Sequence, residues 1–147
     1  MDEIDRRIVQ LLQENGRVSL KTIAEKTYLS SPAVSARIEK LEKDGIILGY
    51  HAQIDLAKLG YPILAFVNLE VAPKDKERFY AYARAVPNIL ECSCVTGEFS
   101  MLLKVAFAST EKLDVFIGQL QTFGRTRTQI VFSTHVGPRG IGAEENT

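Results

Sequence analysis

Hydrophobic residues in the first third of the chain recur with the period of α-helices. Their spacing predicts three short amphipathic helices, over residues 2–16, 19–28 and 29–45. The candidate N-caps are Asp2, Ser19 and either Ser30 or Ser31. The predicted inward-facing residues are Ile4, Ile8, Leu11, Leu12, Leu20, Ile23, Ala24, Val34, Ile38 and Leu41. Three short helices with brief connections predict one small helical unit.

After this unit the hydrophobic pattern changes from helical to strand-like. Residues 46–54 suit a strand, and residues 55–61 suit a hinge because glycine and proline follow closely at its end. From residue 63 to residue 71 every odd position is apolar, which is typical of a half-buried strand. Further helices are predicted over residues 74–86 and 110–124, and further strands over residues 89–96, 101–107 and 125–136.

The order β-α-β-β-α-β is that of ferredoxin-like domains, in which two helices cover one face of a four-stranded antiparallel sheet. We therefore predict an α+β protein with a three-helix domain and following strand at residues 1–54 and a hinge at 55–61. A ferredoxin-like domain follows at 62–136 and a flexible tail at 137–147. The uncovered sheet face would mix apolar and polar side chains, which suggests that it binds a partner. Its predicted members are Phe66, Asn68, Glu70, Leu102, Lys104 and Ala106.

Charge qualifies this picture only locally. The 18 basic and 18 acidic residues cancel, which argues mildly against a nucleic-acid binder, because such domains are often strongly basic. Between residues 17 and 43, however, six cations and three glutamates leave a net charge of +3. The helical unit is therefore the part of the chain suited to a polyanion.

Catalytic chemistry is not indicated. The two histidines, His51 and His135, lack neighbours at metal-ligand or triad spacing, and no glycine-rich phosphate loop follows a strand. Cys92 and Cys94 are interpreted as small buried hydrophobes rather than a redox or metal pair. The N-terminus is charged and no apolar run reaches the length of a membrane span. We expect a soluble cytoplasmic protein that is not an enzyme, with no metal, no cofactor and no membrane partner.

The third predicted helix suggests a binding function. Two helices joined by a short turn, the second with small exposed residues, fit a helix-turn-helix, and small side chains let a helix approach base edges in the major groove. Arg37 is suited to bidentate reading of guanine, and Lys40, Lys43 and Lys21 to phosphates. The predicted contacts with double-stranded DNA are Lys21, Ser30, Ser31, Ala33, Ser35, Ala36, Arg37, Lys40 and Lys43. The alternative is an ordinary three-helix domain whose surface has no special role.

Four segments of the chain, in this order, resemble the Lrp/AsnC family of transcription regulators: IDRRIVQLLQENGR, LSSPAVSARIEKLEKDGII, GYHAQID and VTGEFSMLLKV. The resemblance implies a winged or plain helix-turn-helix, a hinge, and a ferredoxin-like domain for effector binding and oligomerisation. It also implies homodimers that pair through their sheets and often form octamers or other assemblies. The expected function is a sequence-specific DNA-binding regulator. Alternatives are an architectural DNA-wrapping protein of low specificity without an effector, and a sensor whose helices do not meet DNA.

The same resemblance implies an amino-acid effector, but one loop departs from the family pattern. Where relatives read Gly-Asp-Tyr-Asp, this chain reads Gly97-Glu98-Phe99-Ser100, and a serine cannot supply the charge that balances an ammonium group. Thr126 and Thr128 resemble the other contributor to that cleft. The expected effector residues are thus Gly97, Glu98, Ser100, Thr126 and Thr128. An atypical amino acid, another small molecule and no effector remain as alternatives.

Overall fold

The structure is a computed structural model that describes residues 1–142 of the chain. It divides into two compact units. One consists of Met1–Gln53 with the segment that begins at Val136, and the other is Ile54–His135. Each unit has its own buried hydrophobic cluster.

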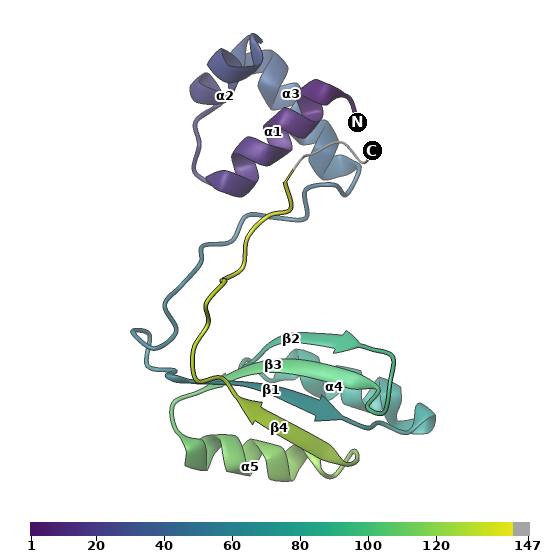
Figure 1. Cartoon of the computed structure of the whole chain (residues 1–147). Coiled ribbons are helices and arrows are strands. Elements are labelled where there is room, and N and C mark those ends of the chain that lie inside the picture. The colour runs from purple at the N-terminus through teal and green to yellow at the C-terminus, as the bar shows by residue number, and fades with distance from the viewer. Residues whose placement is uncertain (143–147) are drawn as a thin grey trace. The chain divides into compact units, whose positions relative to one another are not determined.

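The first unit consists of the three predicted helices, α1 (Glu3–Glu14), α2 (Leu20–Thr27) and α3 (Ser31–Lys43) (Figure 1). Its core is Ile8, Leu11, Ile23, Ala24, Val34 and Leu41, with Ile4, Leu12 and Ile38 packed against it. These are the predicted inward positions, with one exception. Leu20 is exposed, because it is the first residue of α2 and lies beyond the packed turns of that helix.

Side-chain caps fix where the three helices begin. Asp2 and Asp5 form a reciprocal capping box at α1, and Ser19 Oγ accepts from the backbone N–H of Thr22 at α2. Ser30, rather than Ser31, caps α3, since its Oγ accepts from the backbone N–H of Ala33. Each cap satisfies an N–H group that has no partner within its helix.

The strand predicted at residues 46–54 is wrong. The backbone N–H groups of Ile46 and Ile47 both donate to the carbonyl of Leu41, so the chain first closes the end of α3. The following residues are irregular, and Gly49 has a φ of 157°. A strand requires a hydrogen-bonded neighbour, and among residues 1–142 no strand pairs with this segment. Its apolar residues therefore do not specify a sheet by themselves.

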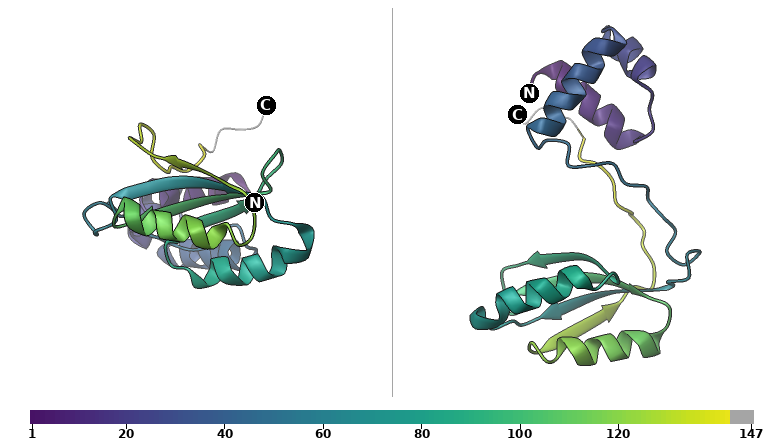
Figure 2. Two further views of the ribbon diagram at one scale, coloured as in Figure 1. Left: turned by 90° about the horizontal axis from the view of Figure 1, so that it is seen from below. Right: turned by 180° about the vertical axis from the view of Figure 1, so that it is seen from behind.

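The second unit has the predicted β-α-β-β-α-β order. Its elements are β1 (Ile63–Leu69), the 3-10 turn η1 (Pro73–Asp75), α4 (Lys76–Ala85), β2 (Ile89–Cys94), β3 (Met101–Phe107), α5 (Thr110–Leu120) and β4 (Thr126–Ile130). The strands form one antiparallel sheet in the order β2-β3-β1-β4. Both helices lie on one face of it (Figure 2). The ferredoxin-like prediction is confirmed, although β4 ends six residues earlier than expected.

Alternation along the central strands separates a covered face from an open one. The covered side chains of β1 and β3 are buried against side chains of α4 and α5. From the strands this core includes Ala65, Val67, Leu69, Met101, Leu103 and Val105, and from the helices Phe79, Phe116 and Leu120. The open face carries Phe66 opposite Lys104 and Asn68 opposite Leu102, as the spacing predicted. Phe66 is 36% exposed, so this face leaves a large apolar side chain partly uncovered.

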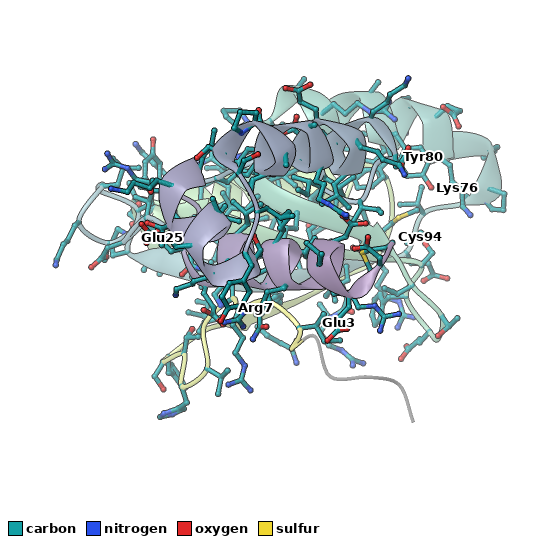
Figure 3. The ribbon with its side chains drawn as sticks, turned by 90° about the horizontal axis from the view of Figure 1, so that it is seen from above. Glu3, Arg7, Glu25, Lys76, Tyr80 and Cys94 are labelled. Atoms are coloured by element: carbon teal, nitrogen blue, oxygen red, sulfur yellow. The ribbon has the colours of Figure 1, made fainter. Side chains whose placement is uncertain are left out.

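The two cysteines contradict their prediction, because both are exposed. They lie on β2, which is an edge strand, and their side chains border a groove of about 260 Å³ with Tyr80 and Arg84 of α4. Figure 3 labels Tyr80 and Cys94. Partial burial and the neighbouring Cys94 raise the pKa of the Cys92 thiol, which disfavours the reactive thiolate.

The described part of the C-terminal segment contacts the helical unit. Gln53 Nε2 donates to the carbonyl of Pro138 at 2.8 Å, and Gln13 Nε2 donates to the carbonyl of Ile141 at 3.2 Å. Residues 137–142 therefore join the helical unit. Residues 143–147, the rest of the predicted tail, lie outside the described residues.

Candidate nucleic-acid interface

Helix α3 has two faces with different compositions. The inward stripe repeats at i, i+3, i+4 and i+7 and consists of Val34, Arg37, Ile38 and Leu41. The opposite face repeats at i, i+3, i+4, i+7, i+8 and i+11 and consists of Pro32, Ser35, Ala36, Glu39, Lys40 and Lys43. We call this second set the outer face of α3. It carries small residues in its first two turns and lysines in its last.

The structure brings some predicted DNA contacts together on this outer face and places others elsewhere. Ser35, Ala36, Lys40 and Lys43 lie on it. Ser31 and Ala33 flank it and are half-buried, and Ser30 is occupied as the helix cap. Lys21 is exposed on α2.

Arg37 is engaged in contacts within the helical unit. Its Nη1 is 2.7 Å from Asp2 Oδ2 and 2.7 Å from Asp5 Oδ1, so it joins α3 to the capping box of α1. The physical reason is its position: it comes three residues after Val34 and four before Leu41, which places it beside the core. In this structure Arg37 is a brace between two helices, and its reading of guanine stays a prediction.

The pKa shifts of these groups agree with the brace. Hydrogen bonds from the backbone N–H of Asp5 and from Arg37 lower the pKa of the Asp2 carboxyl. Hydrogen bonds to Asp2 and Asp5 raise the pKa of Arg37. Asp2 and Arg37 are therefore charged together at neutral pH and attract each other.

Sequence reasoning missed two exposed residues of the helical unit. Tyr28, in the turn between α2 and α3, is 96% exposed and adopts a left-handed backbone conformation with a φ of 55°. Glu39 lies in the middle of the outer face of α3 and accepts a hydrogen bond from Ser35 Oγ at 3.3 Å. Glu39 could have been found by extending the helical period from Pro32, because it is seven residues further on.

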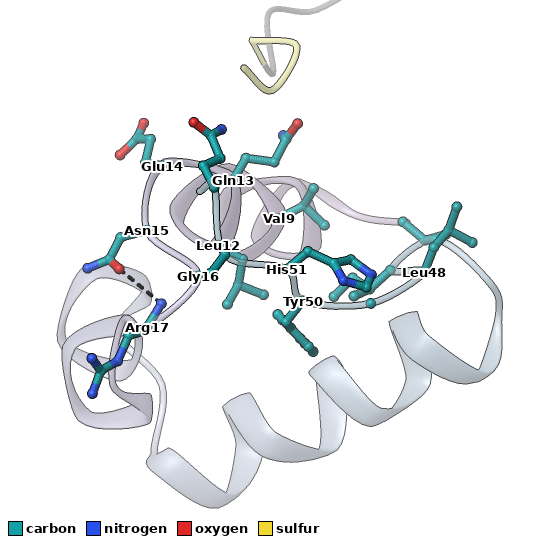
Figure 4. Close-up of a pocket in the computed structure, with 15 residues that line it drawn as sticks. Val9, Leu12, Gln13, Glu14, Asn15, Gly16, Arg17, Leu48, Tyr50 and His51 are labelled. Atoms are coloured by element: carbon teal, nitrogen blue, oxygen red, sulfur yellow. Dashed lines mark hydrogen bonds between the residues drawn. The ribbon is translucent and has the colours of Figure 1, made fainter. Parts of the chain in front are cut away.

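The helical unit also contains a groove of about 730 Å³ between the second half of α1 and residues 46–53 (Figure 4). Leu12, Gln13 and Val9 line one side, and Leu48, Tyr50 and His51 line the other. Tyr50 donates from its hydroxyl to Glu42 Oε1 at 2.9 Å, which ties the second side to α3. The groove lies away from the outer face of α3.

In the second unit, the predicted effector loop begins with a turn that favours glycine. Gly97 has a φ of 107°, a conformation that other residues rarely adopt. Ser100 is engaged inside the protein, since its Oγ accepts from the backbone N–H of Val71 at 3.0 Å and donates to the carbonyl of Leu69 at 3.5 Å. Its hydroxyl is therefore committed to the end of β1.

Two arginines that sequence reasoning missed hold the loop's carboxylate. Glu98 lies 2.8 Å from Arg125 Nη2 and 3.5 Å from Arg127 Nη2, and both guanidinium groups lie over the ring of Phe99. Arg125 also pairs with Glu70 at 3.2 Å. Hydrogen bonds to Glu98 and Glu70 raise the pKa of Arg125. Glu98 of the loop thus joins a network of two positive and two negative side chains with Glu70, Arg125 and Arg127.

The predicted threonines lie on the other side of β4. Thr126 is opposite Leu69 and Thr128 opposite Val67, so both point toward the helix-covered face. Thr126 Oγ1 accepts from Gln121 at 3.4 Å. The intervening Arg127, opposite Asn68, points toward the open face. The alternation of arginine and threonine over residues 125–128 could have predicted that the two residue types face opposite sides of the sheet.

Within residues 1–142, no three side chains of His, Cys, Asp or Glu gather closely enough to hold a metal ion. Over the same residues, every helix is too short or too polar to span a membrane.

Comparison with known proteins identifies relatives of both units. Residues 1–47 match a family model described as winged helix-turn-helix DNA-binding, and residues 64–141 match one described as Lrp/AsnC ligand binding domain. The transcriptional regulator LrpC of Bacillus subtilis is 35% identical over 90% of this chain and 92% of its own length. The regulator FL11 of Pyrococcus horikoshii is 33% identical, covering 92% of this chain and 91% of its own.

Solved structures agree with these matches over nearly the whole chain. B. subtilis LrpC superposes with a TM-score of 0.87 at 33% identity, covering 94% of this chain and 99% of its own. The feast or famine regulatory protein Rv3291c of M. tuberculosis, solved with L-methionine, has a TM-score of 0.89 at 31% identity. That likeness covers 96% of this chain and 98% of the other.

Proposed function

The chain belongs to the Lrp/AsnC family of DNA-binding transcriptional regulators, and from that premise we propose that it reads its operator through the outer face of α3. The observation that carries this proposal is the composition of that face. Small residues at Ser35 and Ala36 allow close approach to base edges, and Lys40 and Lys43 extend the same line toward phosphates.

A binding assay on the DNA upstream of the chain's own gene tests the proposed interface. Lys40→Ala and Lys43→Ala should each weaken binding to all sequences alike, and should reduce the dependence of log affinity on log salt by about one unit. Lys112→Ala is the matched control, because Lys112 is an exposed lysine on α5 of the other unit. Loss of affinity in the control, or none in both α3 variants, would refute this interface.

We further propose that two copies pair through the open sheet face. The partly exposed Phe66 supports this proposal, as does the partly buried side chain of Lys104, whose Nζ lies 3.6 Å from Glu91 Oε1. A two-fold dimer would present two α3 helices to adjacent half-sites, so the operator should be pseudo-palindromic. Pairing also doubles the local positive charge of an otherwise neutral chain. Octamers or other assemblies would require further contacts.

For the effector, we propose an amino acid held near the loop 97–100. The M. tuberculosis relative solved with L-methionine supports this choice. In this chain Glu98 is the carboxylate available for an ammonium group, since the hydroxyl of Ser100 is occupied by backbone groups. The ligand's amine would then compete with Arg125 and Arg127 for Glu98. Gly97 would supply the turn, whereas Thr126 and Thr128 face the helix-covered side of the sheet and are not part of this proposed site.

A thermal-shift screen with the twenty amino acids tests the effector proposal. A ligand that binds the folded protein raises the melting temperature with the logarithm of its concentration above its dissociation constant. Glu98→Gln should remove the shift, whereas Glu77→Gln, at an exposed position on α4, should leave it unchanged. The absence of a shift with all twenty would favour another small molecule or no effector.

A further inference from the structure

The outer face of α3 contains one carboxylate that no role yet explains. Glu39 is exposed in the middle of this face, between Ala36 and Lys43 along its length. In the described part of the chain, no cation lies within ion-pair distance of it, although Lys43 follows by one helical turn. Its negative charge is therefore presented, without neutralisation, to whatever approaches the face.

A carboxylate in this position is costly beside DNA unless it finds a hydrogen-bond donor. The phosphate backbone repels it, and among the groups of the major groove only the amino groups of cytosine and adenine donate. Glutamate is suited to the N4 amino group of cytosine, since it only accepts, whereas adenine also presents the N7 acceptor that repels it.

Ser35 orients this carboxylate. Its Oγ donates to Glu39 Oε1 at 3.3 Å across one helical turn, which leaves Oε2 without a protein donor among the described residues. Ser35 lies on the same outer face and is half-buried, so it supports Glu39 from the side nearer the start of the helix. A small first turn followed by an oriented acceptor is the geometry of a base reader rather than of a phosphate contact.

We propose that Glu39, positioned by Ser35, reads a cytosine in each half-site of the operator by accepting from its N4 amino group. This inference rests on the proposed interface on α3. It transfers the reading role that the sequence suggested for Arg37 to a residue two positions later. Glu39 acts as a specificity residue, and Ser35 as a positioning residue.

Selection of binding sites from a randomised pool of duplexes, at one fixed salt concentration, tests the proposal. The wild type should prefer cytosine at one position of each half-site by about 5-fold or more, since a good base contact discriminates by about 5-fold to 150-fold. Glu39→Ala should bring that position to within about 2-fold of equality while the other positions keep their preferences. Glu39→Gln should change the preference to adenine, because glutamine pairs with adenine N6 and N7.

Ser35 is tested by the presence of its hydroxyl. Ser35→Ala should reduce the preference for cytosine at the same position. Ser35→Thr, which keeps a hydroxyl, should retain that preference. Glu14→Gln is the matched control, because it removes one exposed carboxylate on the side of α1 away from α3 (Figure 4). The control should leave every base preference unchanged.

Three outcomes would overturn the inference. The first is a Glu39→Ala variant that keeps every base preference, and the second is one that binds all sequences more tightly by one common factor. The third is a Glu39→Gln variant that still selects cytosine. A wild type that selects no sequence would instead refute the proposed interface, so the two failures are distinguishable.

Discussion

At the scale of single residues, position relative to the core decides which cation is free to act. Arg37 has the chemistry of a guanine reader, but helical geometry places it beside Val34 and Leu41, where two carboxylates bind it. Lys40 lies on the opposite side and is exposed. Residue type alone did not reveal these ion pairs, because the two carboxylates lie 35 and 32 residues away in the sequence.

The brace formed by Arg37 predicts an acid-dependent stability of the helical unit. The folded protein lowers the pKa of Asp2 below its ordinary value of 3.8, so the unfolded chain takes up protons at higher pH than the folded one. Asp2 therefore contributes fully above that value, and its contribution is lost as pH falls through the lowered pKa. Thermal melts at about pH 5 and about pH 3 should show this loss.

Arg37→Met should reduce the difference between these two melts, since one of the groups that stabilise the Asp2 carboxylate is removed. Some difference should remain, because the backbone N–H of Asp5 still donates to Asp2 at 2.8 Å. Arg6→Met is the control, since Arg6 is an exposed arginine on α1, the helix that Asp2 caps. An unchanged pH difference in Arg37→Met would show that the brace contributes nothing in solution.

Tyr28 permits a second prediction at this scale. A left-handed backbone conformation is unfavourable for tyrosine and is tolerated by asparagine, and the exposed side chain packs on little. Tyr28→Asn should therefore raise the free energy of unfolding by about 0.5 kcal/mol, whereas Tyr28→Phe should leave it unchanged. Denaturant unfolding measures both, and a loss above about 1 kcal/mol in Tyr28→Asn would contradict the argument.

At the scale of elements, local periodicity was sufficient wherever an element had a packing partner. The five α-helices and four strands of the described residues were all predicted, and Ile8 and Val67 are fully buried where the pattern placed them. Residues 46–54 have strand-like composition, but pairing is a tertiary property that their sequence does not contain. The ion pairs of Glu98 were not predicted for the same reason, because its two arginines are about 30 residues away in the sequence.

The junction between β1 and β4 offers a matched pair of glycine substitutions. The backbone N–H of Glu70 donates to the carbonyl of Arg125 at 2.9 Å, and a Cβ added at Gly124 would collide with the carbonyl oxygen of Glu70. Gly124→Ala should therefore lower the free energy of unfolding by about 1–3 kcal/mol, because backbone must move. Gly118→Ala, inside α5 with open space at its Cβ, should raise it by about 0.5–1 kcal/mol.

Urea unfolding followed by circular dichroism measures both variants. Gly118→Ala controls for the general effect of replacing glycine by alanine, because both substitutions remove the same flexibility from the unfolded chain. Equal effects in the two variants would contradict the close backbone contact at Gly124.

At the scale of the whole molecule, the proposed dimer would supply what one chain lacks. The chain has zero formal net charge, and its cationic segment is confined to the helical unit. Its two units have separate cores, so each can present a surface without exposing the other's apolar residues. A second copy would double the lysine-bearing helix faces and cover the open sheet face at the same time. Specific binding and dimer formation should therefore be lost together.

Phe66→Asp tests this coupling. It replaces an apolar side chain at the centre of the open face by a charge, opposite Lys104, where a monomer accepts it without loss of core packing. The dimer dissociation constant should rise about 30-fold or more in sedimentation measurements, the scale of a central interface residue. Operator affinity should fall with it, since joining two half-site contacts contributes a factor of about 10² to 10⁴. Val115→Asp, on the exposed side of α5, should change neither quantity. A Phe66→Asp protein that stays dimeric and binds DNA normally would place the dimer contact on another surface.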